Sequence, residues 1–592
     1  MEWALRDPTR FLHERAAFER LAKEVDWLAA LAWRLDAGLA VEVYFVLEIH
    51  GNTYAATLTY PDLFPETPAY IRPRDSSQQW SYHQYGAGGS LCLEWRADNW
   101  DSRVTGADLV RSAHTLLATE RNPDQPARVP SAHHMTPGQM MRSSQHRFVC
   151  TAGVLAVLAS LPASVKRRLC TKTLLHRSTT VGFVSQIETA NGSMQDIGDL
   201  PSGIVSHLPL FAWPGDGQIL RSDAFDLRAT ISSVEDLLDM IQRAGFLKQT
   251  VLVQEPGSAK YKDRLVLLLG AEPRSIRAFG VDASEQPTLH EYRVILPEEQ
   301  SQRLPVEHAR LAEMRIGIVG LGSIGSKVAV SLARSGARKF LLVDDDLLVP
   351  GNLCRHELSW ASAGVHKAEA VHEALSLVAP AIDVRVRAHR VAGQESALKA
   401  AAALKDLASC DLLIDATANP SVFLRLASIA KTNRRPLCWG ELFAGGIGGM
   451  IVRARPDLDP NPTAVRAAVL RHLEQLPPAP YQQAGGYDVE DQQPLIAYDG
   501  DVGQIASALT RFVLDTALQR NPSDFPYSAY LIGLRKAWIF SQPFDTHPIE
   551  VLGAGWDSES DPAVVDNDRK EAIQVLLEIA VKGQRAHTDS PS

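Results

Sequence analysis

The residues with the clearest chemical pattern are three glycines and an aspartate in the second half of the sequence. Gly320, Gly322 and Gly325 form a G-x-G-x-x-G pattern between an apolar run at 315–319 and a helical pattern. In such a loop the first glycine permits a tight turn, the second lets phosphates approach the backbone, and the third lets helix and strand pack closely. Asp344 ends the next apolar run, where a carboxylate can bind a ribose hydroxyl. The spacing predicts a nucleotide site.

Asp346 follows this loop as a further cofactor-binding candidate. The amide and the two cations that come after it, Asn352, Arg355 and Lys367, favour a triphosphate. Arginine and lysine can neutralise the charge that builds up when a carboxylate attacks the α-phosphate of ATP and pyrophosphate leaves. An NAD-dependent oxidoreductase is the rival enzyme class, but it does not explain Asn352, Arg355 and Lys367.

The order of these motifs resembles the adenylation domain of ubiquitin-activating enzymes. It is also similar to bacterial adenylyltransferases that activate sulfur-carrier proteins. The resemblance is strong over 314–455 and weak over 456–540. It implies ATP with Mg²⁺, Asp344 of the D-x-D motif on the ribose with Asp346 in the same cofactor site, and three residues around the phosphates: Asn352, Arg355 and Lys367.

One segment departs from the family pattern. The family commonly has D-x-T-D-N, with a magnesium-binding aspartate, where this chain has Asp415-Ala416-Thr417-Ala418-Asn419. Asp415 remains as the metal-ligand candidate, in a structural or outer-shell role. Ala418 therefore keeps a non-catalytic nucleotide-binding scaffold open as a third possibility. The glycine-dense segment at 439–449 is expected either to admit a carrier tail or to form a tight turn.

A second chemical centre is expected at Cys92. Prolines precede it in the loop 60–68, His83-Gln84-Tyr85 lies upstream, and Trp100 follows. This arrangement, over 10–120, resembles the ubiquitin-conjugating core and implies a thioester-forming thiol on Cys92. In that family an asparagine stabilises an oxyanion, and Gln84 is the candidate to replace it. The alternative is a small core residue between two leucines.

Enzymes that activate ubiquitin carry a catalytic cysteine of their own. The cysteines of this chain differ in how well they could fill that role. Cys410 and Cys438 fall in or beside expected buried strands, so we expect them to be packed. Cys354, between Asn352 and Arg355, is the better candidate. Ala497 stands where related fused enzymes place a cysteine, and direct transfer from the adenylate to Cys92 is a further option.

The elements that position these residues follow from periodicity. Apolar spacing at 9–39 predicts a helix, and two strands at 41–47 and 54–59 are joined by a turn at Gly51-Asn52. After 314 strands and helices alternate, which indicates a parallel sheet. Expected strands are 315–319, 339–343, 384–388, 411–415 and 436–440, and expected helices are 323–335, 365–378, 394–407 and 420–431.

We therefore expect a multidomain chain. It has an N-terminal α+β ubiquitin-conjugating-like domain, a middle degenerate α/β domain and a C-terminal α/β Rossmann-like adenylation domain. The boundaries are 1–121, a linker at 122–145, 146–312 as a degenerate adenylation-like or linker domain, 313–582, and a disordered tail at 583–592.

Composition excludes several other classes. The 592 residues carry a formal net charge of -9, and there is no long Lys/Arg run, so we expect no nucleic-acid partner. No run of 18 apolar residues occurs, so we expect no membrane span. The six cysteines form no C-x-x-C pair, and no signal peptide follows Met1, so we expect a reducing, cytoplasmic setting.

Both resemblances in one bacterial-looking chain are similar to the fused enzymes of cyclic-oligonucleotide (CBASS) anti-phage defence. This similarity implies adenylation of the C-terminal tail of a cGAS-like nucleotidyltransferase or ubiquitin-like protein, then conjugation to a target-protein amine. It also implies a homodimer built through the activating domain.

Overall fold

The computed structural model describes residues 1–81, 83–120, 141, 144–205, 212–229, 231–254, 262–272, 274–282, 285–297, 303–391, 397–443, 445–478, 497–557, 569–577 and 579. The chain divides into two compact units, Met1–Ser143 and Ser144–Ser592, and each is described by itself. Most of the predicted linker at 122–145 and the whole predicted tail at 583–592 lie outside the described residues.

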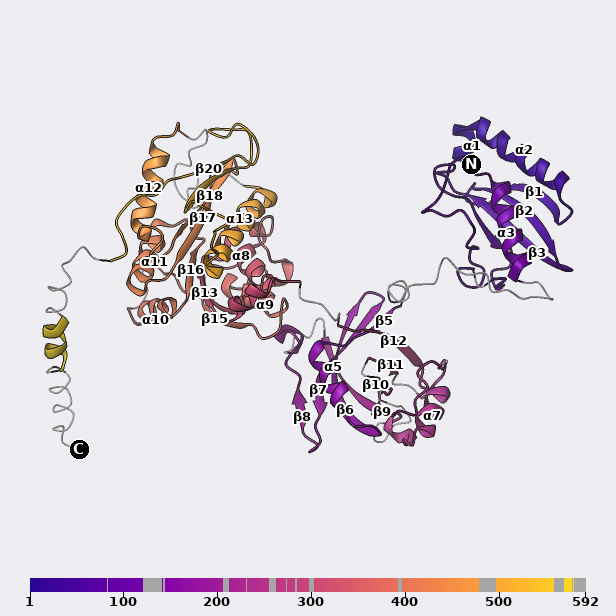
Figure 1. The fold of residues 1–592 in the computed structure, drawn as a ribbon, viewed down its shortest axis with the longest axis horizontal. Helices are drawn as coiled ribbons and strands as arrows, with labels where there is room; N and C mark the ends of the chain where they lie inside the picture. Colours follow the sequence, from indigo (N-terminus) through magenta and orange to yellow (C-terminus); the bar gives the residue numbers. More distant parts are fainter. Residues whose placement is uncertain are drawn as a thin grey trace. The chain divides into compact units, whose positions relative to one another are not determined.

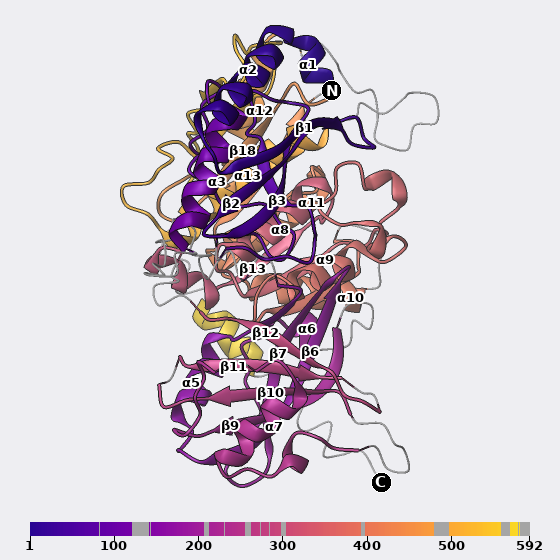
Figure 2. The same cartoon turned by 90° about the vertical axis from the view of Figure 1, so that its right-hand side faces the viewer.

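The first unit is an antiparallel sheet covered by helices. Its strands follow chain order, β1-β2-β3-β4, as the ribbon shows for β1 to β3 (Figure 2). One hydrophobic core contains residues of these strands and of α1, α2 and α3. A buried carboxylate also ties the unit together, because Glu14 accepts hydrogen bonds from Tyr60 Oη at 2.6 Å and Gly106 N at 2.7 Å. The elements are α1 (Glu2–Arg6), α2 (Pro8–Glu24), β1 (Leu28–Leu35), β2 (Val41–Ile49), β3 (Asn52–Tyr60), β4 (Tyr70–Pro73) and α3 (Gly106–Glu120).

Two sequence-based expectations for this unit are wrong in part. The helix predicted over 9–39 ends at Glu24, and the next residues form β1, because leucines at 28, 31 and 35 also satisfy a strand whose register shifts between Ala29 and Ala32. The hairpin turn lies at His50-Gly51 rather than at Gly51-Asn52, since Asn52 already pairs with Ile49.

The middle region is a mixed sheet that closes on itself. Described pairings run β5-β12-β11-β10-β9-β6-β7, and β5 also pairs with β7. The hydrophobic core within this ring includes residues of α5, whereas α7 packs on a second core (Figure 1). The elements are β5 (His146–Val149), α5 (Ala152–Ser160), β6 (Val165–His176), β7 (Thr179–Glu188), β8 (Met194–Asp196), α6 (Ser202–Val205), β9 (Ala212–Arg221), α7 (Val234–Arg243), β10 (Arg264–Leu269), β11 (Ile276–Val281) and β12 (Leu289–Ile295).

This topology bears on the two alternatives for 146–312. An adenylation-like half requires parallel strands joined by crossover helices. Most pairings here are antiparallel, including β6–β7, β6–β9 and β10–β11. The arrangement therefore favours the linker-domain alternative.

The C-terminal region is built on a second eight-stranded sheet with order β15-β14-β13-β16-β17-β18-β19-β20. The pairings from β15 to β17 are parallel, and those from β17 to β20 are antiparallel. The strands are β13 (Arg315–Val319), β14 (Lys339–Val343), β15 (Asp383–Arg387), β16 (Leu412–Asp415), β17 (Leu437–Phe443), β18 (Gly448–Ala454), β19 (Ala529–Gly533) and β20 (Thr546–Pro548).

Helices cover both faces of this sheet (Figure 1). One core contains residues of α8, α9 and α13, and the opposite core contains residues of α10, α11 and α12. The helices are α8 (Ser323–Arg334), α9 (Lys367–Ser376), α10 (Ala397–Ala408), α11 (Pro420–Asn433), α12 (Pro462–Glu474) and α13 (Asp499–Leu518). The predicted α/β domain is confirmed, with each predicted element within three residues of its observed bounds. In the described part of the chain, no helix is long and apolar enough to cross a bilayer.

Candidate functional site

The parallel strands bring the predicted nucleotide-site residues to one edge of the sheet. Val319 pairs with Val343 on one side and with Asp415 on the other. The loops after these strands therefore start side by side. The strand order also reverses between β13 and β16, and ligands of open α/β sheets bind at such a switch point.

The glycines of the first loop have the conformations that a phosphate loop requires. Gly320 has a φ of +85°, and a Cβ on Gly325 would lie 1.9 Å from the Gly320 carbonyl oxygen. Gly322 differs from both, because nothing lies within 4 Å of an added Cβ. It also precedes α8 without a side-chain cap. The first backbone N–H groups of α8 therefore face open space, which fits an anionic ligand.

This difference gives a prediction. Gly322→Ala should leave the melting temperature nearly unchanged but weaken ATP binding about tenfold or more, because its methyl group occupies the space that phosphates need. Binding is measured by titration of the full chain with a fluorescent ATP analogue. Gly325→Ala should lower the melting temperature, because its Cβ overlaps backbone. Equal ATP affinity in the wild type and Gly322→Ala would count against phosphate binding at this loop.

Hydrogen bonds connect the loop to the two aspartates and the lysine. The Asp344 carboxylate accepts from Leu321 N at 2.6 Å and from Asp346 N at 2.8 Å. The Lys367 ammonium group pairs with the Asp346 carboxylate, and Lys367 N donates to Asp346 O at 2.9 Å. Burial raises the pKa of Asp344, whereas these backbone hydrogen bonds and the charge of Lys367 oppose the rise. Each carboxylate oxygen retains a second lone pair for a ligand hydroxyl.

The segment with Asn352 and Arg355 is anchored to the same loop. His356 Nε2 donates to Leu321 O at 2.8 Å. The Asn352 side chain accepts from Val349 N at 3.2 Å and so closes the turn that precedes Cys354. The Cys354 thiol is exposed. The structure thus links Asp344, Asp346 and Lys367 to the glycine loop, and it places Asn352, Cys354 and Arg355 in the segment just before His356, which is hydrogen-bonded to that loop.

Asp415 also reaches this edge, but it is buried and locally engaged. Its Oδ1 accepts from Thr417 N at 2.9 Å and Thr417 Oγ1 at 2.6 Å. Burial raises its pKa. Glu441 on β17 was assigned no role from the sequence. Burial raises the pKa of Glu441, and the charge of Asp415 raises it further. Among the described residues no group of three or more His, Cys, Asp or Glu side chains is arranged to hold a metal. Mg²⁺ bound with ATP commonly needs only one or two carboxylates, because phosphates and water supply the other ligands.

Cys92 lies in the first unit at the end of a hydrogen-bonded turn. Its N donates to His83 O at 2.6 Å, and Tyr85 N donates to Ser90 O at 3.0 Å. The thiol is half-buried in a pocket of about 250 Å³, whose walls include Tyr85, Trp95 and Arg96. The glycines before Cys92 therefore build a defined turn.

The Gln84 side chain, the predicted oxyanion donor, is engaged by the backbone of its own loop. Its Oε1 accepts from Trp80 N at 2.7 Å, and its Nε2 donates to Gln78 O at 3.0 Å. Both ends of the amide thus hold the backbone in place, and the residue is buried. These partners become visible only in the folded chain, because no sequence pattern specifies them.

The thiols differ in environment as expected. Burial raises the pKa of Cys92, and a hydrogen bond with Tyr85 and the charge of Arg96 partly offset that rise. Burial raises the pKa of Cys410 and of Cys438 to about 12, which confirms that both are packed. Ala497 lies just before α13 and packs against the core there.

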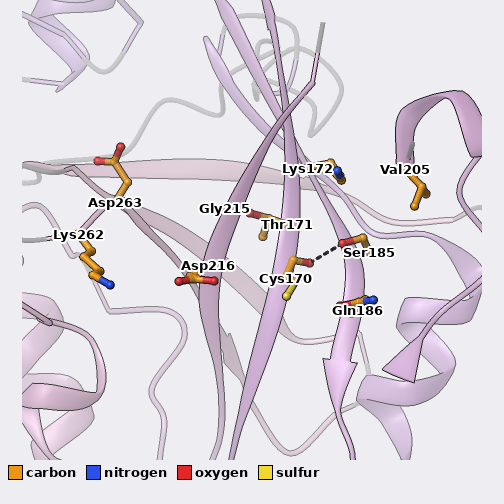
Figure 3. Close-up of a pocket in the computed structure, with 10 residues that line it drawn as sticks. All are labelled: Cys170, Thr171, Lys172, Ser185, Gln186, Val205, Gly215, Asp216, Lys262 and Asp263. Atoms are coloured by element: carbon orange, nitrogen blue, oxygen red, sulfur yellow. Dashed lines mark hydrogen bonds between the residues drawn. The ribbon is translucent and has the colours of Figure 1, made fainter. Parts of the chain in front are cut away.

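A larger pocket of about 660 Å³ lies in the middle region, over β6 and its neighbours β7 and β9 (Figure 3). Lys172, Lys262 and Asp216 are among its lining residues, and Ser185 Oγ donates to Cys170 O at 3.2 Å. Sequence analysis identified no motif there. Among the described residues around this pocket there is neither a glycine loop nor the start of a long helix, so we keep the nucleotide site at β13.

Comparison with known proteins supports the assignment of the C-terminal region. Residues 299–479 match the ThiF family. The uncharacterized protein y4qC of Sinorhizobium fredii is 34% identical over 437 residues, which cover 69% of this chain and 71% of that protein. The ATP-dependent ubiquitin transferase-like protein Cap2 of Escherichia coli is 38% identical over 128 residues, or 21% of this chain and 20% of that protein.

Among solved structures, E. coli MccB with ATP shares 17% identity and covers 42% of this chain and 67% of that chain, at a TM-score of 0.32. A likeness at this TM-score adds nothing to the assignment, which depends on the match to the ThiF family and on y4qC. The chain is therefore a ThiF-type adenylation protein and belongs to the same bacterial family as y4qC.

Proposed function

We propose that the chain uses ATP to adenylate the C-terminal carboxylate of a small protein and passes the acyl group through Cys92 to an amine. The observation that carries this proposal is the set of hydrogen bonds joining the glycine loop to Asp344, Asp346 and Lys367. A site built only for a dinucleotide does not need a buried lysine, or the Asn352–Arg355 turn anchored beside it.

In the first step a carboxylate oxygen of the carrier bonds to the α-phosphorus of ATP. The bond from that phosphorus to the bridging oxygen breaks, and pyrophosphate leaves with its electron pair. Lys367 and Arg355 neutralise the charge that develops on the phosphates. Mg²⁺, when bound, neutralises part of the same charge, and Asp415 is the candidate to orient its water from the end of β16.

In the second step the acyl group moves to sulfur. The Cys92 thiolate attacks the acyl carbon, a C–S bond forms, and AMP leaves. We propose a ubiquitin-conjugating-like role for residues 1–121, since the four-stranded meander, the flanking helices and the half-buried Cys92 support it. The adenylate acyl group reaches Cys92 either directly or through Cys354, which is exposed beside Arg355.

The carrier proposed here is the C-terminal tail of a ubiquitin-like protein or of a cGAS-like nucleotidyltransferase, and the setting is anti-phage defence. The similarity to Cap2, whose name describes an ATP-dependent ubiquitin transferase-like protein, supports this choice. A homodimer through the activating domain also remains a prediction.

The variant Cys92→Ala distinguishes the adenylation step from the thioester step. The variant should retain ATP–pyrophosphate exchange with a nucleotidyltransferase or ubiquitin-like protein as carrier, but it should form no thiol-sensitive adduct on the first unit. Adduct formation is measured on non-reducing gels, with and without reductant. A carrier shortened at its C-terminus is the control and should support neither reaction. No exchange with any carrier of these two classes would contradict the adenylation step.

A further inference from the structure

Tyr85 has a fixed position beside Cys92. Hydrogen bonds from Cys92 N to His83 O and from Tyr85 N to Ser90 O hold the two ends of the loop together. Between them, Gly86 has a φ of +75° and Gly88 a φ of +69°, and a Cβ on Gly89 would lie 1.9 Å from the Tyr85 carbonyl oxygen. The turn is therefore tight, and it fixes the backbone of Tyr85 relative to that of Cys92.

The Tyr85 side chain is 62% exposed, yet its phenol lies beside the Cys92 thiol. Both residues line the same pocket of about 250 Å³, where the two side chains are close enough for each to affect the ionisation of the other. Partial burial and then the neighbouring Cys92 raise the pKa of Tyr85, so the phenol keeps its proton at neutral pH and is able to donate to a thiolate. An exposed tyrosine gains little from packing, so this contact is the clearest reason for its position.

The other polar groups near the Cys92 sulfur interact with other partners. Arg96 affects both Cys92 and Tyr85 through its charge, but its guanidinium also donates to Asp98 at 3.1 Å. Gln84 is committed to Trp80 and Gln78. Of the neighbours described here, Tyr85 supplies the neutral hydroxyl donor to the sulfur.

We propose that Tyr85 is a catalytic residue of the Cys92 site, whose phenol O–H stabilises the thiolate each time it forms. The role rests on the proposed function of Cys92. During loading, Cys92 loses its proton to solvent, and Tyr85 donates a hydrogen bond to the thiolate until the C–S bond forms. During transfer, the amine nitrogen bonds to the acyl carbon, the C–S bond breaks, the sulfur leaves with the electron pair, and the amine proton goes to solvent. Tyr85 then donates to the departing thiolate and keeps its own proton throughout.

Alkylation of the full chain with iodoacetamide tests this role without ATP or carrier. Only the thiolate reacts appreciably, so the rate at Cys92, followed by peptide mass spectrometry from pH 6.5 to 10, reports its thiolate fraction. Tyr85→Phe should slow Cys92 about three- to tenfold at pH 7.5 and move the midpoint to higher pH, because a hydrogen bond to a charged group is lost. Tyr70→Phe removes a hydroxyl from the same pocket and should leave the profile unchanged.

Cys354 serves as an internal reference, because it is exposed in the other unit and should react equally in all variants. An unchanged Cys92 profile in Tyr85→Phe, or the same shift in Tyr70→Phe, would overturn the role of Tyr85. These alkylation results test only the role of Tyr85, and they say nothing about whether Cys92 forms a thioester. Conversely, a wild-type chain that forms no thioester would refute the proposed function without changing the alkylation result.

Discussion

Lys367→Ala should lower ATP–pyrophosphate exchange by about a hundredfold or more, in line with the loss of one preorganised donor to a developing charge. Lys367 is buried, and its ammonium group pairs with Asp346 beside the glycine loop. The substitution removes a positive charge and also leaves the Asp346 carboxylate without this partner. Both changes disfavour a triphosphate. Affinity for a fluorescent ATP analogue, measured on the full chain, should fall as well.

Lys339→Ala is the matched control for Lys367→Ala. Lys339 lies on β14 of the same sheet, but it is at the N-terminal end of that strand and pairs with exposed Glu313. Its removal should change exchange less than twofold, since surface pairs contribute little. Equal losses in the two variants would show that Lys367 acts on the fold rather than on the nucleotide.

Arg453→Ala should cause the largest loss of stability in the C-terminal region, about 3–5 kcal/mol. Arg453 on β18 is fully buried, and its guanidinium donates to Asp515 Oδ2 at 2.5 Å and to Phe525 O at 2.7 Å. It also stacks over Phe512, 4.4 Å from the ring centroid. Truncation leaves the buried Asp515 carboxylate without its cation and creates a cavity between β18 and α13.

Because the chain has several domains, this loss is best measured locally, by hydrogen exchange of peptides from β18 and α13. Arg434→Ala is the control, since its partners Asp457 and Asp557 are both exposed. It should shift protection by less than about 1 kcal/mol. Similar shifts for the two arginines would contradict a central role for the buried ion pair.

The sequence was most informative where local patterns alone determine structure. The elements from β13 to β17 were predicted closely, because each has a distinct apolar period and the glycine loop marks the first turn. By contrast, Leu28 and Leu31 fit a helix and a strand equally well. The closure of the middle sheet depends on the pairing of β5 with β7, which no local pattern encodes.

The candidate sites, too, were predictable where local sequence patterns determine them and not where they depend on tertiary contacts. The spacing of Asp344, Asn352, Arg355 and Lys367 predicted one site, and in the structure hydrogen bonds link Asp344 and, through Asp346, Lys367 to the glycine loop. Gln84 was predicted to be an oxyanion donor, and the structure adds backbone partners that no sequence pattern specifies. Tyr85 received no role, because its proximity to Cys92 depends on a turn whose hydrogen bonds only the structure shows.

Equilibrium competition between nucleotides tests most directly whether the residues around the glycine loop hold a triphosphate. The full chain is first loaded with a fluorescent ATP analogue in the presence of Mg²⁺ and then titrated with ATP or with NAD⁺. ATP should displace the analogue from the wild type, Gly322→Ala should bind the analogue weakly, and NAD⁺ should displace little of it. Tight binding of NAD⁺ without competition by ATP would contradict an adenylation site.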